Sequence, residues 1–165
     1  MEARKMIVNV RIDERLIHGQ VATMWTNHLK VNRIMVVDNV VVKNEMEKDV
    51  LKMAKPNSVK LSILTTKGAS ARITNGQYDD QRVFLIVKNP ATLVELVDNG
   101  VMLEEINIGN MSAKKGSKQV AKSIGVTPED IEAFKHLNEK GVKLVAQMVP
   151  NEDKSDFMKL LREEN

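Results

Sequence analysis

One short segment combines a histidine with residues that could orient it and bind a phosphoryl group. A neutral imidazole has a lone pair on one ring nitrogen, and this form is well populated near neutral pH, so His18 could act as a nucleophile. Asp13 could hydrogen-bond the other ring nitrogen and select the tautomer. Arg11 and Arg15 offer planar guanidinium groups whose donors match the oxygens of a phosphoryl group. The segment therefore predicts phosphoryl chemistry on His18.

The residues after His18 could complete the binding loop. Gly19 would let the backbone approach a bound group closely, and Gln20 adds an amide donor. A helix predicted to begin at Gly19 or Gln20 would place its free amide groups and the positive end of its dipole beside the imidazole. The residues expected on the inward stripe of this helix are Val21, Met24, Trp25 and His28.

A structural role for the histidines is the alternative. A histidine between the apolar pair Leu16-Ile17 and a glycine could cap a helix or bind a buried carbonyl, so residue types alone leave both roles open for His18. His28 lies on the expected apolar stripe and is interpreted as structural. His136 is expected near a helix carboxyl end, where a cation is favourable. Three dispersed histidines and no cysteine match no metal-ligand spacing, so we expect no metal.

Further polar or basic segments could lie at the same edge of the fold. Thr65, Thr66 and Lys67 could bind phosphate through hydroxyl and ammonium groups, but they also fit an ordinary helix start. The run Gly109-Asn110-Met111 is expected to form a loop. A docking patch for an acidic partner, or simply a solvated surface, could be formed by four lysines: Lys114, Lys115, Lys118 and Lys122.

Composition limits the class of protein. The 165 residues fit one domain spanning 1–165, and the absence of cysteine agrees with a reducing, cytosolic compartment. A net charge of +3 with one Trp, one Tyr and three Phe offers few platforms for stacking bases, so no nucleic-acid partner is expected. The first apolar run breaks at Asn9, so we expect neither a signal peptide nor a membrane span. The nucleotide-binding and hydrolase motifs GxxxxGK[ST], GxGxxG and GxSxG are missing, so no ATP or NAD cofactor is expected.

Short runs of apolar, β-branched residues alternate with amphipathic stretches. Several runs are apolar at nearly every position, as strands covered on both faces require, which predicts an α/β fold with an open, mostly parallel sheet and helices on both faces. The predicted strands are Met6 to Val10, Ile34 to Val37, Val59 to Leu64, Val83 to Val87, Ile106 to Ile108 and Leu144 to Val149.

Helix ends are also visible in the sequence. Asn89-Pro90 begins a predicted helix that Gly100 ends, and Thr127-Pro128 begins another that ends before Gly141. The stretch from Gly116 to Val126 fits either period and is interpreted as a strand. A terminal helix is predicted from Lys154 to Glu164, with Phe157, Leu160 and Leu161 on one stripe.

The pattern Arg11-x-Asp13-x-Arg15-Leu16-Ile17-His18-Gly19-Gln20-Val21, with Trp25 beyond it, resembles the active loop of the enzyme IIB component of the mannose/sorbose family of the bacterial sugar phosphotransferase system. The run looks most like the amino-sugar branch, which includes N-acetylgalactosamine systems. Glu14 stands where many members carry a second Asp. The resemblance continues through Asp38-Asn39, Lys88-Asn89-Pro90, Asn107-Ile108-Gly109-Asn110-Met111 and Val149-Pro150.

This resemblance implies a seven-stranded, mostly parallel sheet and a phosphoryl carrier. In family terms His18 accepts a phosphoryl group at Nδ1 from the phosphohistidine of a IIA component and passes it to a sugar that enters through the membrane components IIC and IID. Asp13 maps onto the orienting acid and Arg15 onto the phosphate-stabilising arginine, with Arg11 a weaker candidate. The protein would be cytoplasmic and peripherally associated with the permease. The sugar and the oligomeric state stay open.

Two other classes of function fit the same loop. In the first, the loop only holds a phosphate or a sugar phosphate at the helix amino terminus without forming a covalent bond. In the second, the protein is a metal-independent phosphatase that uses His18 as a transient nucleophile. The fate of the phosphoryl group distinguishes a binder, a phosphatase and a carrier.

Overall fold

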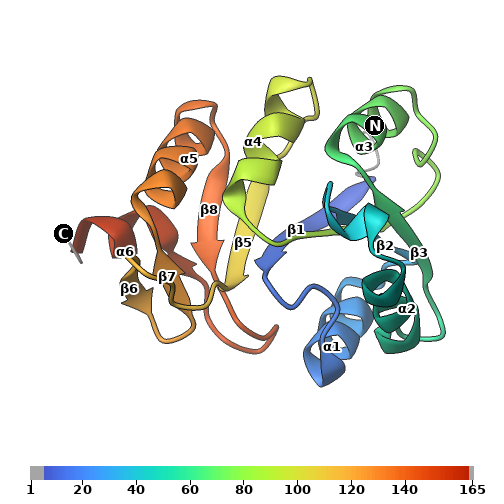
Figure 1. Cartoon of the computed structure of the whole chain (residues 1–165), viewed down its shortest axis with the longest axis horizontal. Helices are drawn as coiled ribbons and strands as arrows, with labels where there is room; N and C mark the ends of the chain where they lie inside the picture. Colours follow the sequence, from blue (N-terminus) through green and yellow to red (C-terminus); the bar gives the residue numbers. More distant parts are fainter. Residues whose placement is uncertain (1–5, 164–165) are drawn as a thin grey trace.

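The computed structural model describes residues 6–163, and its central feature is a seven-stranded sheet. The strand order is β3-β2-β4-β1-β5-β8-β9, with every pair parallel except β8 and β9 (Figure 1). The α/β prediction is therefore confirmed. The strands of this sheet are β1 (Ile7–Asp13), β2 (Arg33–Val37), β3 (Lys60–Leu64), β4 (Val83–Val87), β5 (Glu105–Asn110), β8 (Lys143–Ala146) and β9 (Ser155–Asp156).

Two hydrophobic clusters cover the two faces of the sheet. One contains Trp25 and Leu51 from the helices α1 (Gly19–Leu29) and α2 (Glu45–Ala54), packed on alternate residues of β2 and β4. The other contains side chains from α3 (Thr66–Thr74), α4 (Pro90–Asp98), α5 (Pro128–Glu139) and α6 (Phe157–Glu163). Figure 1 shows α1 and α2 on one side and α3, α4 and α5 on the other. Coverage of both faces explains why β4 is buried at all five positions.

Side-chain caps account for the predicted helix starts. The Asn89 side chain accepts a hydrogen bond from the amide of Thr92 at the start of α4. Thr127 and Asp130 form a reciprocal capping box at the start of α5, where Pro128 occupies the first turn. The predicted helices after Asn89 and Thr127 are thus confirmed.

Several strand boundaries differ from the prediction. The first strand continues to Asp13, so Arg11 and Asp13 belong to β1 and not to the loop that follows it. Gly109 and Asn110 belong to β5, so the expected loop there is wrong. The last long strand ends at Ala146, because the Gln147 side chain donates to the carbonyls of Pro150 (3.3 Å) and Glu152 (2.7 Å) and closes a turn.

The stretch predicted as one strand from Gly116 to Val126 is a β-hairpin. Its strands β6 (Lys118–Ala121) and β7 (Ile124–Val126) pair antiparallel and form a separate two-stranded sheet. At the carboxyl end, Ser155–Asp156 forms the edge strand β9, so the terminal helix starts at Phe157, later than predicted. Its predicted last residue, Glu164, lies outside the described residues.

All six parallel strands end at one edge of the sheet, and the connections that follow them gather there. After β1 the chain enters α1 on one face, whereas the helices after β4 and β5 lie on the other face. A reversal of this kind beyond the carboxyl ends of strands is where ligands bind in open parallel sheets. None of the helices within residues 6–163 is both long and apolar enough to cross a membrane.

Candidate active site

The loop between β1 and α1 exposes His18 at the surface, while the two residues before it are buried. Leu16 and Ile17 are both 4% exposed and belong to the cluster under α1, whereas His18 is exposed. The turn is closed by a hydrogen bond from the amide of Leu16 to the carbonyl of Asp13 (2.9 Å). Leu16 and Gly19 have positive φ values of 60° and 49°, so the backbone is left-handed on either side of Ile17 and His18. The apolar pair thus anchors the loop and presents the imidazole to solvent.

The amino end of α1 differs from those of the next four helices. Asn44, Thr65, Asn89 and Thr127 cap α2, α3, α4 and α5 with side-chain oxygens. At α1 the N-cap residue is His18, which makes no side-chain cap, and the first turn contains no acidic residue. The amides of the first turn therefore have no side-chain acceptor there and are available to an anion beside the imidazole. The predicted helix start at Gly19 is confirmed.

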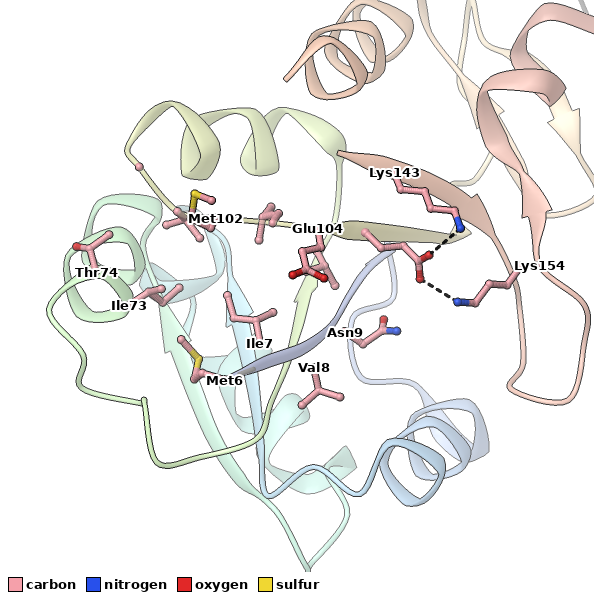
Figure 2. A pocket seen from close by; sticks show the side chains of 15 residues that line it. Met6, Ile7, Val8, Asn9, Ile73, Thr74, Met102, Glu104, Lys143 and Lys154 are labelled. Carbon is pink, nitrogen blue, oxygen red and sulfur yellow. Dashed lines mark hydrogen bonds and ion pairs between the residues drawn. The ribbon is translucent and has the colours of Figure 1, made fainter. Parts of the chain in front are cut away.

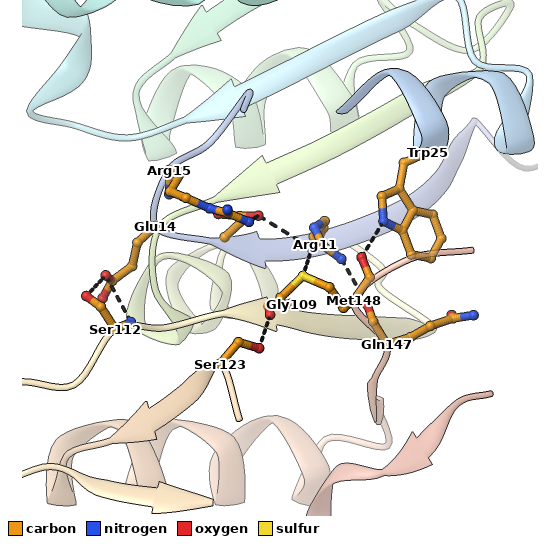
Figure 3. Close-up of polar contacts among 10 residues, drawn as sticks. Arg11, Glu14, Arg15, Trp25, Gly109, Ser112, Ser123, Gln147 and Met148 are labelled. Carbon is orange, nitrogen blue, oxygen red and sulfur yellow. Dashed lines mark hydrogen bonds and ion pairs between the residues drawn. The ribbon is translucent and has the colours of Figure 1, made fainter. Parts of the chain in front are cut away.

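Asp13 holds Arg15 in a two-pronged ion pair. Nε of Arg15 lies 3.0 Å from Oδ1 of Asp13, and Nη2 lies 3.0 Å from Oδ2 (Figure 3). The Asp13 carboxylate is 1% exposed, whereas the Arg15 side chain that it binds is 33% exposed. Asp13 was expected to hydrogen-bond His18, but within residues 6–163 its carboxylate bonds arginines and the Arg15 amide, and the imidazole takes part in no hydrogen bond. Asp13 thus orients Arg15.

Arg11 is buried beneath the loop and is not a surface donor. Its guanidinium donates to the carbonyl of Gln147 (3.0 Å) and lies 3.4 Å from Asp13, 3.5 Å from the sulfur of Met148 and 5.5 Å from the centre of the Trp25 ring. Its side chain is 2% exposed, so these contacts use its donors inside the protein. The expectation that Arg11 reaches a phosphoryl group is corrected: it joins β1 to the turn after β8.

The environment of Arg11 explains a glycine that sequence reasoning assigned to a loop. A Cβ atom on Gly109 would lie 2.2 Å from Cζ of Arg11, so only glycine leaves room for the buried guanidinium. Burial lowers the pKa of Arg11 from its ordinary value, and the neighbouring carboxylate of Asp13 opposes that shift. The buried cation therefore depends on Asp13 for compensation.

Trp25 fastens α1 to the same turn. Its indole nitrogen donates to the carbonyl of Met148 at 2.9 Å, and its side chain is 2% exposed. Arg11 and Trp25 together hold the Gln147-Met148 turn against β1 and α1 (Figure 3). The tryptophan in the sequence motif is therefore a structural support of the His18 helix.

Glu14 connects the His18 loop to the chain after β5, a contact that sequence reasoning missed. Its carboxylate accepts from the amide of Ser112 (3.1 Å) and from the Ser112 hydroxyl, and it pairs with Nζ of Lys114 (2.9 Å). The amide of Glu14 donates to the carbonyl of Asn110 at 3.1 Å. Burial raises the pKa of Glu14, but these hydrogen bonds and the Lys114 charge outweigh it, so the pKa is lowered. Because the partners lie about 100 residues away in the chain, no local pattern reveals the contact.

Thr65, Thr66 and Lys67 lie at the carboxyl end of β3, which β2 and β4 separate from β1. Three strand spacings amount to about 14 Å. The Thr65 hydroxyl caps α3, while the amide and hydroxyl of Thr66 both donate to Oδ1 of Asn39. These contacts support the helix-start interpretation and leave a phosphate role of this segment as a prediction.

The other two histidines lie apart from the loop. His28 is exposed, with its ring edge-on to Trp25 at 6.1 Å, and Met24 is 39% exposed, so the predicted inward stripe of α1 is wrong at these two positions. It is confirmed for Trp25, which is buried, and for Val21, which packs against the same cluster. The buried residues of α1 are Ala22, Trp25 and Thr26. His136 lies 3.0 Å from Asp98, near the end of α5 as expected. No group of three or more His, Cys, Asp or Glu side chains within 6–163 is placed to hold a metal.

A cavity of about 690 Å³ lies at the opposite edge of the sheet, where β1, β5 and β8 begin. Its lining includes Ile7 and Asn9 of β1, and Glu105 there pairs with Lys143 and Lys154 (Figure 2). Since His18 follows the far end of β1, this cavity belongs to a different region from the candidate active site.

Comparison with known proteins agrees with this geometry. The family described as "PTS system sorbose subfamily IIB component" matches residues 7–165. The chain is 37% identical over 153 residues to the sorbose-specific EIIB component of Lacticaseibacillus casei, covering 93% of each protein. It is also 37% identical over 151 residues to the mannose-specific EIIAB component of Escherichia coli K12, covering 92% of this chain and 47% of that longer protein. Equal identity to relatives named for two sugars favours neither sugar.

A solved structure shows the same fold. The IIBSor domain of the sorbose permease from Klebsiella pneumoniae superposes with a TM-score of 0.93 at 34% identity, covering 98% of this chain and 99% of that one. The fold is therefore shared over nearly the whole chain. The chain belongs to the sorbose subfamily of IIB components of the sugar phosphotransferase system.

Proposed function

We propose that His18 carries a phosphoryl group that it accepts from the phosphohistidine of a IIA component and passes to a sugar translocated by membrane IIC and IID components. The observation that carries this proposal is the exposed imidazole at the one helix among α1–α5 whose amino end has no side-chain cap. An anionic group on His18 would meet the free amides of that first turn.

Arg15 supplies the positive charge in this proposal. Its guanidinium is held by Asp13 on one edge and is one-third exposed, so the remaining donors are available to phosphoryl oxygens. Phosphoryl transfer passes through a loose, in-line transition state, and catalysis is mostly positioning and neutralisation of the equatorial oxygens. Gly19 and Gln20 contribute the first amides of α1 and an exposed side-chain amide.

The transfer requires two displacements at phosphorus. In the first, the lone pair of a ring nitrogen of His18 forms a new P–N bond while the P–N bond of the donor breaks and the donor imidazole leaves with its electron pair. The family resemblance assigns this role to Nδ1. In the second, a sugar hydroxyl attacks phosphorus, the bond to His18 breaks, and the hydroxyl proton ends on the released imidazole. Neither step consumes a further reactant.

The proposed donor and acceptor also imply where the protein works. A relative named as an EIIAB component supports a IIA protein as the donor. Transfer to a sugar inside a membrane permease places the protein in the cytoplasm with its carboxyl strand edge toward the membrane. Sugar selection belongs to the membrane components in this scheme, and the amino-sugar branch suggested by the loop sequence is a prediction.

Intact-mass measurement after incubation with the phosphorylated general carriers and a IIA protein tests the proposal. A carrier retains one acid-labile phosphoryl group, a binding module gains no covalent mass, and a phosphatase releases inorganic phosphate without accumulating label. His28→Gln is the matched control, because His28 is an exposed histidine of α1 that lies outside the loop. Label on the His18→Gln variant equal to that on the control would refute the assignment.

A further inference from the structure

One cluster of positive charge lies in the hairpin segment, defined here as residues 111–126. This segment contains four lysines and no acidic residue. The 22 Asp and Glu residues all lie elsewhere in the chain. The lysines that carry this charge are Lys114, Lys115, Lys118 and Lys122, all exposed. These lysines therefore add positive charge to one side of the molecule, where the carboxylate of Glu14 pairs with one of them, Lys114.

The hairpin segment is held beside the His18 loop. Met111 continues β5 into the segment, and its amide donates to the carbonyl of Ser123 at 2.9 Å. The Ser123 hydroxyl donates to the carbonyl of Gly109 at 2.8 Å, and the carboxylate of Glu14 accepts from Ser112 (Figure 3). The same carboxylate pairs with Lys114. Figure 1 shows β6 and β7 beside the carboxyl ends of β5 and β8. The lysines and the imidazole consequently lie at the same edge of the sheet.

The exposed surface of the hairpin segment has no apolar anchor. Its large apolar side chains are all buried, with exposed fractions of 5% or less: Met111, Val120, Ile124 and Val126. What faces solvent is lysine with Ser112, Ala113, Gly116 and Gln119. The centres of specific protein interfaces are rich in aromatic residues, Met and Arg and poor in Lys, so this surface is a poor match for a protein partner. Flexible, strongly hydrated ammonium groups suit a diffuse layer of negative charge.

We infer that the hairpin segment binds the anionic headgroups of a phospholipid membrane and turns the His18 edge toward the bilayer. The inference rests on the proposed function, in which that edge serves an acceptor embedded in the membrane. Each lysine near an anionic surface contributes about a fivefold gain in partitioning, the equivalent of about 1 kcal/mol. The segment would hold the protein close to its acceptor without a lipid anchor or an inserted helix.

Co-sedimentation of the full chain with vesicles tests the inference. Vesicles of equal parts phosphatidylglycerol and phosphatidylcholine should bind the protein at about 0.01 M salt, and pure phosphatidylcholine vesicles should not. Raising the salt to about 0.1 M shortens the screening length from about 30 Å to about 10 Å and should weaken binding. The double variant Lys115→Gln/Lys122→Gln should lower the partition coefficient about 25-fold, as two charges at about fivefold each require.

A charge-matched control separates this surface from net charge. Lys60 and Lys140 are exposed at the opposite edge, at the start of β3 and before β8, so Lys60→Gln/Lys140→Gln should retain vesicle binding. Equal losses in the two double variants, or equal binding to both vesicle types, would overturn the inference.

Phosphoryl uptake from a soluble IIA protein, measured without membranes, should be unchanged in Lys115→Gln/Lys122→Gln. Slowed uptake with no vesicle binding by the unaltered protein would assign the hairpin segment to an acidic protein and refute the lipid role. Vesicle binding with no phosphoryl group on His18 would instead contradict only the proposed function.

Discussion

The carboxylate of Asp13 accepts two hydrogen bonds of 3.0 Å from the guanidinium of Arg15, and its Oδ2 also lies 3.4 Å from Nη2 of Arg11. One buried acid thus serves two arginines with different tasks. Arg11, 2% exposed, joins β1 to the turn after β8, and Arg15, 33% exposed, is presented to the surface beside His18. Arg11 is therefore expected to contribute to stability and Arg15 to activity, and mutations at Asp13 and Arg15 can distinguish the two roles.

Replacing Asp13 should cost stability as well as activity. Asp13→Asn removes the compensating charge from the buried guanidinium of Arg11 and should lower the free energy of unfolding by about 3 kcal/mol. Arg15→Ala should lower it by less than about 1 kcal/mol, because that side chain is partly exposed. Urea unfolding followed by circular dichroism measures both variants. Equal, small losses would mean that Asp13 does not compensate Arg11.

Replacing Arg15 should slow transfer without unfolding the protein. Loss of one positioned donor to a developing anionic charge typically costs about 100-fold in rate, so phosphoryl uptake by Arg15→Ala should fall by about that factor. Arg72→Ala removes the same charge from the exposed end of α3 and should transfer at the normal rate. Rapid-quench measurement of uptake compares them, and normal rates in both variants would remove Arg15 from the site.

Gly109 should be intolerant of even one methyl group. In Gly109→Ala the Cβ would occupy the position of the Arg11 guanidinium, 2.2 Å from Cζ, and we expect a loss of about 3 kcal/mol in unfolding free energy. Gly19→Ala has open space around its Cβ and should lose only about 1 kcal/mol, from its φ of 49°. Thermal denaturation orders the two variants. A smaller loss in Gly109→Ala than in Gly19→Ala would contradict the packing described for Arg11.

Glu14 should contribute stability that disappears in acid. Its pKa in the folded protein is lower than its ordinary value of 4.5, so the unfolded chain binds a proton more readily than the folded one. The stabilisation is therefore complete above pH 4.5 and is lost as the pH falls through the lower, folded pKa. The difference in urea midpoint between the unaltered protein and Glu14→Gln should shrink as the pH drops from neutral through this range. A difference that stays constant with pH would show that the ionised carboxylate is not what stabilises the contact with Ser112 and Lys114.

The sequence predicts the sheet well because its central strands are buried on both faces. β2 and β4 appear as unbroken apolar runs, and the caps at Asn89 and Thr127 mark helix starts by local chemistry. β9 could not be predicted, since Ser155 and Asp156 form a strand only by pairing with Ala146 and Val145. The hairpin at 118–126 could not be distinguished from a single strand, because its turn at Lys122 and Ser123 contains no glycine that would mark it.

The sequence predicts which residues gather at the site, but it does not predict most of their side-chain contacts. His18, Asp13 and Arg15 stand together in a short motif, and the structure places them at one strand end. The burial of Arg11 depends on Gln147, Met148 and Trp25, and the role of Gly109 depends on Arg11. Such long-range packing leaves no local signal in the sequence.

The most direct test of the account is the site of phosphorylation. Incubation of the unaltered protein, His18→Gln and His28→Gln with phosphorylated IIA, followed by intact-mass measurement at alkaline pH, reports the covalent group before acid removes it. The account predicts one acid-labile phosphoryl group on the unaltered protein and on His28→Gln, and none on His18→Gln. A phosphoryl group on His18→Gln, or none on the unaltered protein, would contradict it.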